Sequence, residues 1–208
     1  MTERILVLAP HTDDGELSMG GSIVKFIEQQ KDLYLAAFSS VRASLPPGVP
    51  DDTLVKEIKA AAKVLNIPQD HIILYDYTVR KFSYNRQEIL EDLVKLRREV
   101  EPDIIFLPSP NDLHQDHTTI SQEGIRAFKT DSILGYELPW NNIYFQTQCF
   151  SVLQEKHVQK KIEALLCYKS QKHRGYVNPE FIRGLAIARG VQIKAQYAEA
   201  FEVIRWKL

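Results

Sequence analysis

Short apolar runs that alternate with amphipathic stretches are the feature of this sequence that most constrains its fold. The runs are nearly continuous, as expected for parallel strands that are buried on both faces of a sheet. They occupy residues 4–9, 33–38, 72–75 and 103–107. The last strands are predicted within residues 133–138 and 142–152, and residues 198–206 end the chain with a short apolar segment.

Amphipathic stretches lie between these runs and carry apolar residues at helical spacing. They occupy residues 16–30, 53–65, 86–100, a stretch from 117 to about 128, 154–170 and 178–189. Regular alternation of strands and helices favours a mostly parallel sheet with helices on both faces. The sequence therefore predicts a three-layer, Rossmann-like α/β fold with a twisted sheet.

Length and composition fit one domain. The chain has 208 residues, of which 44% are hydrophobic and 25% are charged, and these values are ordinary for a globular protein. No repeat, low-complexity segment or clear boundary interrupts the chain, so residues 1–208 are predicted to form a single domain. The proline-rich segment 45–51 is better explained as an active-site loop than as a linker.

Charge and cysteine content exclude several classes of partner. The net charge of −1 gives no electrostatic reason to expect nucleic acid or an anionic membrane. No apolar run approaches the roughly 20 residues of a membrane span, and the first residues do not resemble a signal peptide. The two cysteines form no CxxC pair, which favours a reducing compartment. We therefore expect a cytoplasmic protein with a small-molecule partner, and a homo-oligomer remains open.

Two histidine-bearing clusters follow predicted strands. Residues 11–16 read His-Thr-Asp-Asp-Gly-Glu after the first strand, and residues 114–117 read His-Gln-Asp-His after the fourth. Ligands of parallel α/β sheets bind at the carboxyl ends of strands. Acidic residues in the first turn of a helix could simply complement its positive end. That explanation does not cover His11 and His117, so a metal site between the clusters is the simpler reading.

These motifs resemble the signatures of the PIG-L/LmbE-like zinc-dependent N-deacetylases. That family's usual His-Pro-Asp-Asp-Glu is similar to residues 11–15, and its His-x-Asp-His is similar to residues 114–117. Residues 168–171 (Tyr-Lys-Ser-Gln) and 197–201 (Tyr-Ala-Glu-Ala-Phe) also resemble the family. Two positions differ: Thr12 replaces the usual proline, and Gly15 followed by Glu16 replaces the usual glutamate.

The resemblance implies a role for each motif residue. His11, Asp14 and His117 would hold zinc, although other divalent metals such as Fe2+ are compatible with these ligands. Asp13 would be the general base that takes a proton from zinc-activated water. His114 would stabilise the oxyanion, and Asp116 would hydrogen-bond His114 and favour its charged form.

The resemblance further implies hydrolysis of the acetyl amide of an N-acetylglucosamine-type amino-sugar conjugate. The residues suggested to bind this substrate are Arg42, Trp140, Gln171 and Tyr176. Three alternatives are weighed against this function. They are an amidase acting on another small N-acyl substrate, a non-haem iron oxygenase that uses two histidines and one carboxylate, and a binding module without catalysis.

Overall fold

The computed structural model describes residues 2–45 and 48–207. Residues 46 and 47 of the predicted loop 45–51 lie outside these described residues. A seven-stranded sheet forms the centre, with the order β3-β2-β1-β4-β5-β7-β6. Its strands are β1 (Arg4–His11), β2 (Asp32–Ser39), β3 (Ile72–Leu74), β4 (Ile104–Pro108), β5 (Ser132–Tyr136), β6 (Cys149–Leu153) and β7 (Tyr197–Arg205).

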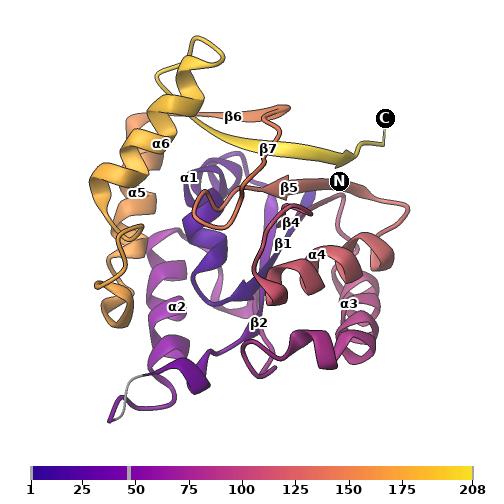
Figure 1. The fold of residues 1–208 in the computed structure, drawn as a ribbon. Helices are drawn as coiled ribbons and strands as arrows, with labels where there is room; N and C mark the ends of the chain where they lie inside the picture. The colour runs from indigo at the N-terminus through magenta and orange to yellow at the C-terminus, as the bar shows by residue number, and fades with distance from the viewer. Residues whose placement is uncertain (1, 46–47, 208) are drawn as a thin grey trace.

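The sheet is parallel from β3 to β5, and β7 pairs antiparallel with both β5 and β6. The α-helices are α1 (Asp14–Glu28), α2 (Thr53–Val64), α3 (Arg86–Val100), α4 (Gln115–Ala127), α5 (Glu155–Leu165) and α6 (Pro179–Val191). The predicted mostly parallel α/β fold with helices on both faces is confirmed (Figure 1).

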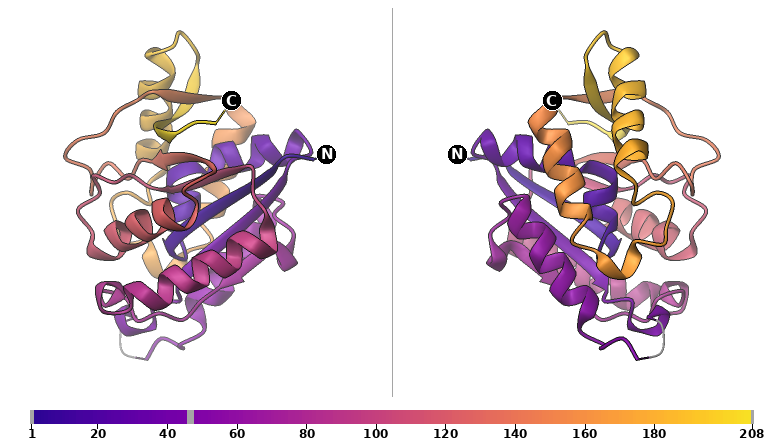
Figure 2. Two further views of the ribbon diagram at one scale, coloured as in Figure 1. Left: turned by 90° about the vertical axis from the view of Figure 1, so that its right-hand side faces the viewer. Right: turned by 90° about the vertical axis from the view of Figure 1, so that its left-hand side faces the viewer.

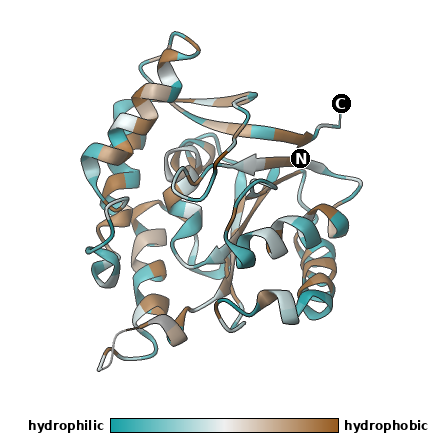
Figure 3. Ribbon diagram, in the orientation of Figure 1, coloured by the Kyte–Doolittle hydropathy of each residue, from teal (hydrophilic) through white to brown (hydrophobic). Residues whose placement is uncertain are grey.

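The helices form two outer layers around the sheet. Helices α3 and α4 cover one face, and α1, α2 and α5 cover the other, with α6 packed on β7 (Figure 2). Each face has its own apolar cluster. In Figure 3 hydrophobic colouring appears on the strands and alternates with hydrophilic colouring along the outer helices. No helix in the described ranges is both long enough and apolar enough to cross a membrane.

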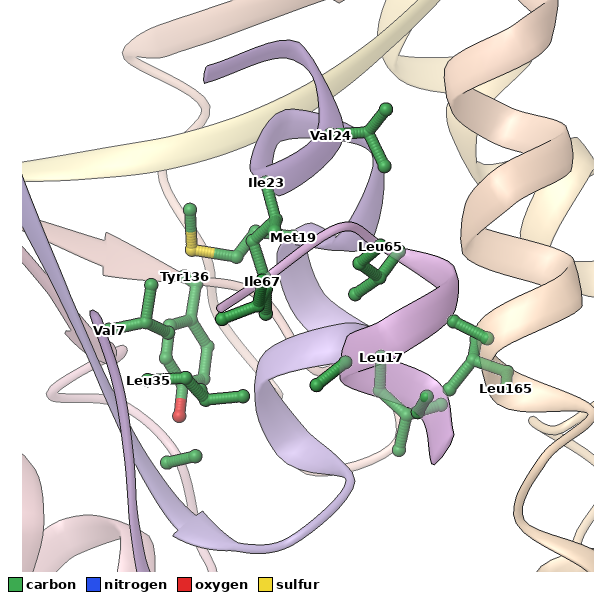
Figure 4. Packing of buried hydrophobic residues seen from close by; sticks show 14 of the residues in the cluster. Val7, Leu17, Met19, Ile23, Val24, Leu35, Leu65, Ile67, Tyr136 and Leu165 are labelled. Carbon is green, nitrogen blue, oxygen red and sulfur yellow. The ribbon is translucent and has the colours of Figure 1, made fainter. Parts of the chain in front are cut away.

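The apolar runs become buried strands because both faces of the sheet are covered. Residues 5–9 of β1 are all fully buried. On the α1 side, Val7 and Leu35 of the sheet pack near Met19 and Ile23 of α1 (Figure 4). Burial of one such aliphatic side chain is worth roughly 1.5–3 kcal/mol, so these contacts hold α1 firmly above β1 and β2.

Helix α1 is kinked at Met19, whose φ of −137° and ψ of 24° lie outside the helical region. The carboxylate of Glu199 on β7 accepts hydrogen bonds from the backbone N–H groups of Gly21 (3.1 Å) and Ser22 (2.7 Å) just after the kink. Lys161 of α5 donates to the same carboxylate at 2.7 Å and to the carbonyl of Ser18 at 3.2 Å. A buried ion pair therefore satisfies the backbone groups of the kinked helix.

Some predicted boundaries are wrong. The predicted helix 154–170 ends at Leu165 and is followed by a separate 3-10 turn, η4 (Lys169–Gln171). Within the predicted strand 142–152 only β6 from Cys149 onward is extended in the sheet, because the preceding loop pairs with residues 112–113. Both differences place loops beside the end of β4, where the candidate site lies.

Candidate active site

Strands β1 and β4 bring the two histidine motifs together. The two strands are parallel neighbours, with Val7 paired to Phe106. The sheet order reverses direction between them, which makes this strand end a topological switch point and a usual binding position. His11 is the last residue of β1, and His114 is the N-cap of α4 after β4. His117 follows on the first turn of α4.

Three ligand atoms converge at this point. The Nδ1 atom of His11 lies 3.1 Å from Oδ2 of Asp14, and Nε2 of His117 lies 3.3 Å from the same oxygen. The two nitrogens are 3.2 Å apart. Adjacent ligands of a tetrahedral zinc ion, with bonds of about 2.0–2.1 Å, are separated by about 3.3 Å. The three atoms therefore form a triangle of the size that one tetrahedral face requires.

Two further carboxylates orient the histidine rings. The Nε2 atom of His11 lies 3.1 Å from Oδ2 of Asp116, and Nδ1 of His117 lies 2.8 Å from Oδ2 of Asp112. Each of these outer nitrogens carries the proton that its carboxylate accepts, which leaves the inner nitrogen with a lone pair. Two nitrogen lone pairs and the Asp14 oxygen then face one another, an arrangement suited to a cation.

The electrostatics of this triad also favour a positive charge. Burial alone would lower the pKa of His117, but the carboxylates of Asp14 and Asp112 raise it to about 10. Burial would raise the pKa of Asp14, but His117 and His11 hold it well below its usual range. In the absence of a metal a proton would therefore occupy the triad, at the position where a metal fits.

Asp13 stands beside the triad at the N-cap of α1 and lines the adjoining cavity. Burial, followed by the negative charge of Asp14, raises the pKa of its carboxyl to about 6. A proton acceptor works best when its pKa lies near the working pH. A carboxylate in this position and with this pKa can accept a proton near neutral pH.

The predicted pairing of the Asp116 carboxylate with His114 is wrong. That carboxylate faces His11 and also accepts hydrogen bonds from the backbone N–H groups of Arg80 (2.6 Å) and Phe82 (3.3 Å). Only the backbone N–H of Asp116 reaches His114, donating to Nδ1 at 3.2 Å. At the start of a helix, the side chains of two residues that are two positions apart point in different directions. The Asp116 carboxylate therefore contacts His11 at the end of β1 and not the neighbouring His114.

His114 is consequently neutral rather than charged. Burial, together with His117 and His11, lowers its pKa to about 4. Because Nδ1 accepts a hydrogen bond, Nε2 carries the proton and can donate it. His11, His114 and His117 also lie close enough together to form an all-histidine cluster. The protonated Nε2 of His114 instead favours a donor role beside the triad formed by His11, Asp14 and His117.

Sequence reasoning missed Asp112. Its carboxylate accepts from the backbone N–H of His114 at 2.8 Å as well as from the ring of His117. Asp112 lies five residues before His117 in the same polar loop. The rule that a ligating histidine donates its second N–H to an oxygen acceptor could have pointed to it.

The structure also accounts for the second departure from the family motif, Gly15 followed by Glu16. A side chain at residue 15 would begin 2.8 Å from the end of the Leu35 side chain, so any larger residue would require Leu35 to shift where α1 contacts the sheet. Glu16 is fully buried, and burial raises its pKa to about 8. Tyr168 lies 2.9 Å from Oε1 of Glu16 and donates to the carbonyl oxygen of Thr12 at 2.6 Å. Glu16 thus supports the motif from behind and does not line the cavity.

A cavity of about 260 Å³ opens beside the triad. Its lining comes from both motifs and from loops far apart in sequence: His11, Thr12, Asp13, Asp14, Val41, Leu54, Val79, Arg80, His114, His117, Trp140, Asn141, Gln171, Arg174 and Tyr176. Three of the four suggested substrate-binding residues are therefore brought together. Arg42 is not, because it lies on η1 (Arg42–Ser44) beside Asp76, with 3.4 Å between charged atoms.

Aromatic rings form one wall of this cavity. Trp140 stacks on Tyr176 with a centroid separation of 3.9 Å and an interplanar angle of 10°. Arg174, which sequence analysis did not single out, donates from Nη1 to the Tyr176 hydroxyl at 2.8 Å. Arg80 and Asn141 were missed as well, because an isolated Arg or Asn in a loop carries no motif. The cavity therefore combines an acidic, histidine-rich floor with an aromatic and cationic wall.

The fold and this site define a mostly parallel α/β protein with a candidate metal site at its switch point. The model of the family PIG-L (GlcNAc-PI de-N-acetylase) matches residues 6–128. The chain belongs to this family, as the motifs predicted. Diacetylchitobiose deacetylase of Thermococcus kodakarensis is 26% identical over 133 residues, covering 60% of this chain and 49% of the relative. This chain thus spans about half the length of that relative.

Solved structures show the same fold. The N,N'-diacetylchitobiose deacetylase of Pyrococcus horikoshii superposes with a TM-score of 0.83 at 20% identity, covering 97% of this chain and 84% of that one. TT1542 of Thermus thermophilus also gives 0.83, at 21% identity, covering 100% and 97%. GalB of Pseudomonas putida, a 4-carboxy-2-hydroxymuconate hydratase, gives 0.81 at 20% identity, covering 100% and 98%. Deacetylases and a hydratase share this fold, so the reaction must be argued from the site.

Proposed function

We propose that this chain is a metal-dependent N-deacetylase that hydrolyses the acetyl amide of an N-acetylglucosamine-type sugar conjugate. The observation that carries the proposal is the triangle of inner ligand atoms from His11, Asp14 and His117 with Asp13 beside it. Membership of the de-N-acetylase family supports the reaction type. The diacetylchitobiose deacetylase relative supports an acetylated amino sugar as substrate.

His11, Asp14 and His117 would hold the metal, which we propose to be zinc, with Fe2+ as the alternative. When bound, such an ion polarises the acyl carbonyl and makes water more acidic. Two nitrogens and one oxygen are ligands that zinc commonly takes in catalytic sites. Asp112 and Asp116 would hold the two histidine rings in the ligating orientation.

Asp13 would perform the proton transfers. As a water oxygen forms its bond to the acetyl carbon, the Asp13 carboxylate accepts a proton from that water. The carbon–nitrogen bond then breaks, and Asp13 returns the proton to the departing nitrogen, which yields acetate and a free amine. Burial and Asp14 raise the pKa of this carboxyl to about 6 in the metal-free chain, and a bound cation would lower it, so the group would be ionised and able to accept a proton at neutral pH.

The neutral His114 would stabilise the negative charge that develops on the acyl oxygen. Its Nδ1 is occupied by the backbone N–H of Asp116, so its Nε2–H is free to donate. A donor already oriented before the reaction needs no reorganisation as charge develops. The stacked Trp140 and Tyr176 would hold a sugar face, and Gln171 would bind a hydroxyl group.

The remaining predictions rest on the sequence and the fold. One continuous sheet with an apolar cluster on each face supports a single domain over residues 1–208. The cytoplasmic location and a homo-oligomer stay predictions.

The test measures acetate release and metal content together. Zinc-loaded protein should release acetate from N-acetylglucosamine and its conjugates, lose this activity on chelation and regain it with zinc. Metal analysis should find one ion per chain, and His117→Ala should abolish its binding. Zinc-loaded protein that cleaves only other N-acyl amides would replace the acetyl-sugar substrate with the amidase alternative. Protein that binds no metal, or hydrolyses no amide in a broad panel, would contradict the proposal.

A further inference from the structure

We infer that the substrate carries an oxyanion, a carboxylate or a phosphate, beyond the acetylated sugar, and that Arg174 binds it at the exposed side of the cavity. This inference rests on the proposed function and adds the chemical class of the conjugate. It comes from the partners of Arg174, from the way its loop is held, and from the distribution of charge around the cavity.

Among the described residues, the guanidinium of Arg174 has only neutral hydrogen-bond partners. Its Nε donates to Oε1 of Gln171 at 2.5 Å, and its Nη1 donates to the Tyr176 hydroxyl at 2.8 Å. No carboxylate of the described residues lies within 4.0 Å of it, whereas Arg183 and Arg189 on the following helix are both paired with glutamates. A guanidinium has five N–H donors in a planar fork, so Arg174 keeps donors for a further acceptor.

The loop that carries Arg174 is fixed at several points. The carboxylate of Glu57 on α2 accepts from the backbone N–H of Ser170 at 3.0 Å and from its hydroxyl at 2.6 Å. Farther along, Val177 is buried, and its N–H donates to the carbonyl of Arg174 at 3.0 Å. The guanidinium carbon also lies 5.7 Å from the centre of the Tyr176 ring. Because the loop is held before binding, little conformational freedom is lost when a ligand arrives.

Charges around the cavity are separated by depth. The carboxylates of Asp13 and Asp14 belong to the triad end, where Asp14 is buried. Arg80 and Arg174 belong to exposed positions of the same cavity and come from different loops. A divalent ion in the triad would match the two carboxylates, so Asp13, on which Arg174 acts in the metal-free chain, would no longer balance the charge of Arg174. An oxyanion on the outer part of the substrate complements Arg174, and arginine suits such groups through paired hydrogen bonds.

The alternative is that Arg174 is a solvent-exposed arginine that borders the cavity without binding the substrate. This alternative predicts that removing the Arg174 charge changes the affinity for neutral and anionic ligands by the same factor. The inferred role predicts a selective effect, because charge-assisted hydrogen bonds exist only with the anion. The two explanations therefore differ in the predicted ratio of the affinities for anionic and neutral ligands, and not in the predicted activity.

The experiment compares zinc-loaded wild type, Arg174→Gln, Arg174→Lys and the control Arg98→Gln. Arg98 is an exposed arginine on α3 outside the cavity, so its replacement changes the net charge equally. The ligands are N-acetylglucosamine, its 1-phosphate, its 6-phosphate and N-acetylmuramic acid, which carries a carboxylate. Affinity is measured by quenching of Trp140 fluorescence in a Trp206→Phe background, and kcat/KM is measured by acetate release.

At least one anionic ligand should bind wild type about 10- to 100-fold more tightly than the neutral sugar, which is the range expected for a charge-assisted pair. Arg174→Gln should lose this ratio, Arg174→Lys should keep part of it, and Arg98→Gln should keep all of it. Whether phosphates or the carboxylate show the preference identifies the source of the oxyanion.

Equal affinity of wild type for neutral and anionic ligands, or an unchanged ratio in Arg174→Gln, would overturn the inference while leaving the deacetylase proposal intact. Failure to release acetate from any ligand would instead count against the proposed function, and the affinity ratios would still decide the role of Arg174.

Discussion

The triad end and the outer wall of the cavity are built in opposite ways. The triad end consists of His11, Asp14 and His117 with their carboxylate partners, and all of them are buried. The outer wall consists of Trp140, Gln171, Arg174 and Tyr176, which are exposed or half-buried. The first comes from two short motifs at neighbouring strand ends, and the second comes from two loops near the C-terminal half of the chain.

Under the proposed function, this difference separates the residues that perform the reaction from those that select the substrate. Buried groups with fixed partners hold their positions to a fraction of an ångström, which metal binding and proton transfer require. Loop residues on a rigid scaffold can vary without disturbing the sheet, and this freedom suits recognition. Substitutions at the triad end should therefore abolish activity or metal binding, while those at the wall should change affinity for particular ligands.

The largest effect is expected for Asp13→Asn. The amide cannot accept a proton, so kcat should fall by about 10²- to 10⁴-fold, the usual contribution of general base catalysis. Metal content should stay at the wild-type level, because Asp13 is not one of the converging ligands. Steady-state acetate release with metal analysis measures both quantities. Asp51→Asn, at an exposed position, is the matched control.

The pH profile provides a second readout of the same residue. The base acts when ionised, so kcat/KM should rise with pH until Asp13 has lost its proton. Burial and Asp14 raise the pKa of Asp13 to about 6 in the metal-free chain, and a bound cation would lower that pKa. The rising limb should therefore lie at or below about pH 6 and disappear in Asp13→Asn. A limb that survives in this variant would assign the base to another group.

The next effect concerns the partners of the histidine rings. Asp112→Asn removes the charge that orients His117 through a 2.8 Å contact. Zinc affinity should fall by about 10- to 100-fold, as is typical when such partners are lost. Competition with a fluorescent chelator gives the dissociation constant. Asp116→Asn should act in the same direction through His11, and unchanged affinity in both variants would contradict the assigned triad.

A smaller effect is expected at the aromatic wall. Trp140→Ala removes the ring that stacks on Tyr176 at 3.9 Å. Stacking contributes about 0.5–1.5 kcal/mol, so KM for a sugar substrate should rise up to about tenfold while kcat changes little. Trp206→Ala, beyond the end of β7, is the control. A fall in kcat with unchanged KM would place Trp140 with the chemistry instead of with recognition.

The smallest effect is expected for substitution of Glu16, which is buried behind the motif. It should change the stability of the metal-free protein. Burial raises the pKa of the Glu16 carboxyl to about 8 from its ordinary value of 4.5. Between these two values the folded chain keeps a proton that the unfolded chain releases. Stability contributed by the protonated group is therefore complete below about pH 4.5 and is lost as the pH rises toward 8.

Glu16→Gln should consequently lose less thermal stability than wild type between pH 5 and about 8. The melting temperature Tm of chelator-treated protein measures this difference. Parallel Tm curves for the two proteins would show that Glu16 is ionised in the folded chain. That result would not bear on the assignment of the triad, because Glu16 contacts Tyr168 and not a proposed ligand.

Most of the fold, and the two motifs that meet at the ends of β1 and β4, could be predicted from the sequence. Apolar runs such as residues 4–9 encode burial on both faces directly, because a strand covered on two sides needs no polar residues. The motif at residues 11–14 and the motif at 114–117 each lie within one turn of a helix start. Their grouping at one strand end follows from the chain order of a parallel sheet.

Tertiary structure alone decided which groups touch across the two motifs and what surrounds them. Asp116 faces His11 because β1 and β4 lie side by side and the first turn of α4 directs its carboxylate toward the neighbouring strand. Asp112 faces His117 within the segment that follows β4. Arg42 is directed to Asp76, whereas Arg174 reaches the cavity through a loop anchored by Glu57. Residue identity and spacing fix local chemistry, but contacts between distant loops depend on how the helices pack on the sheet.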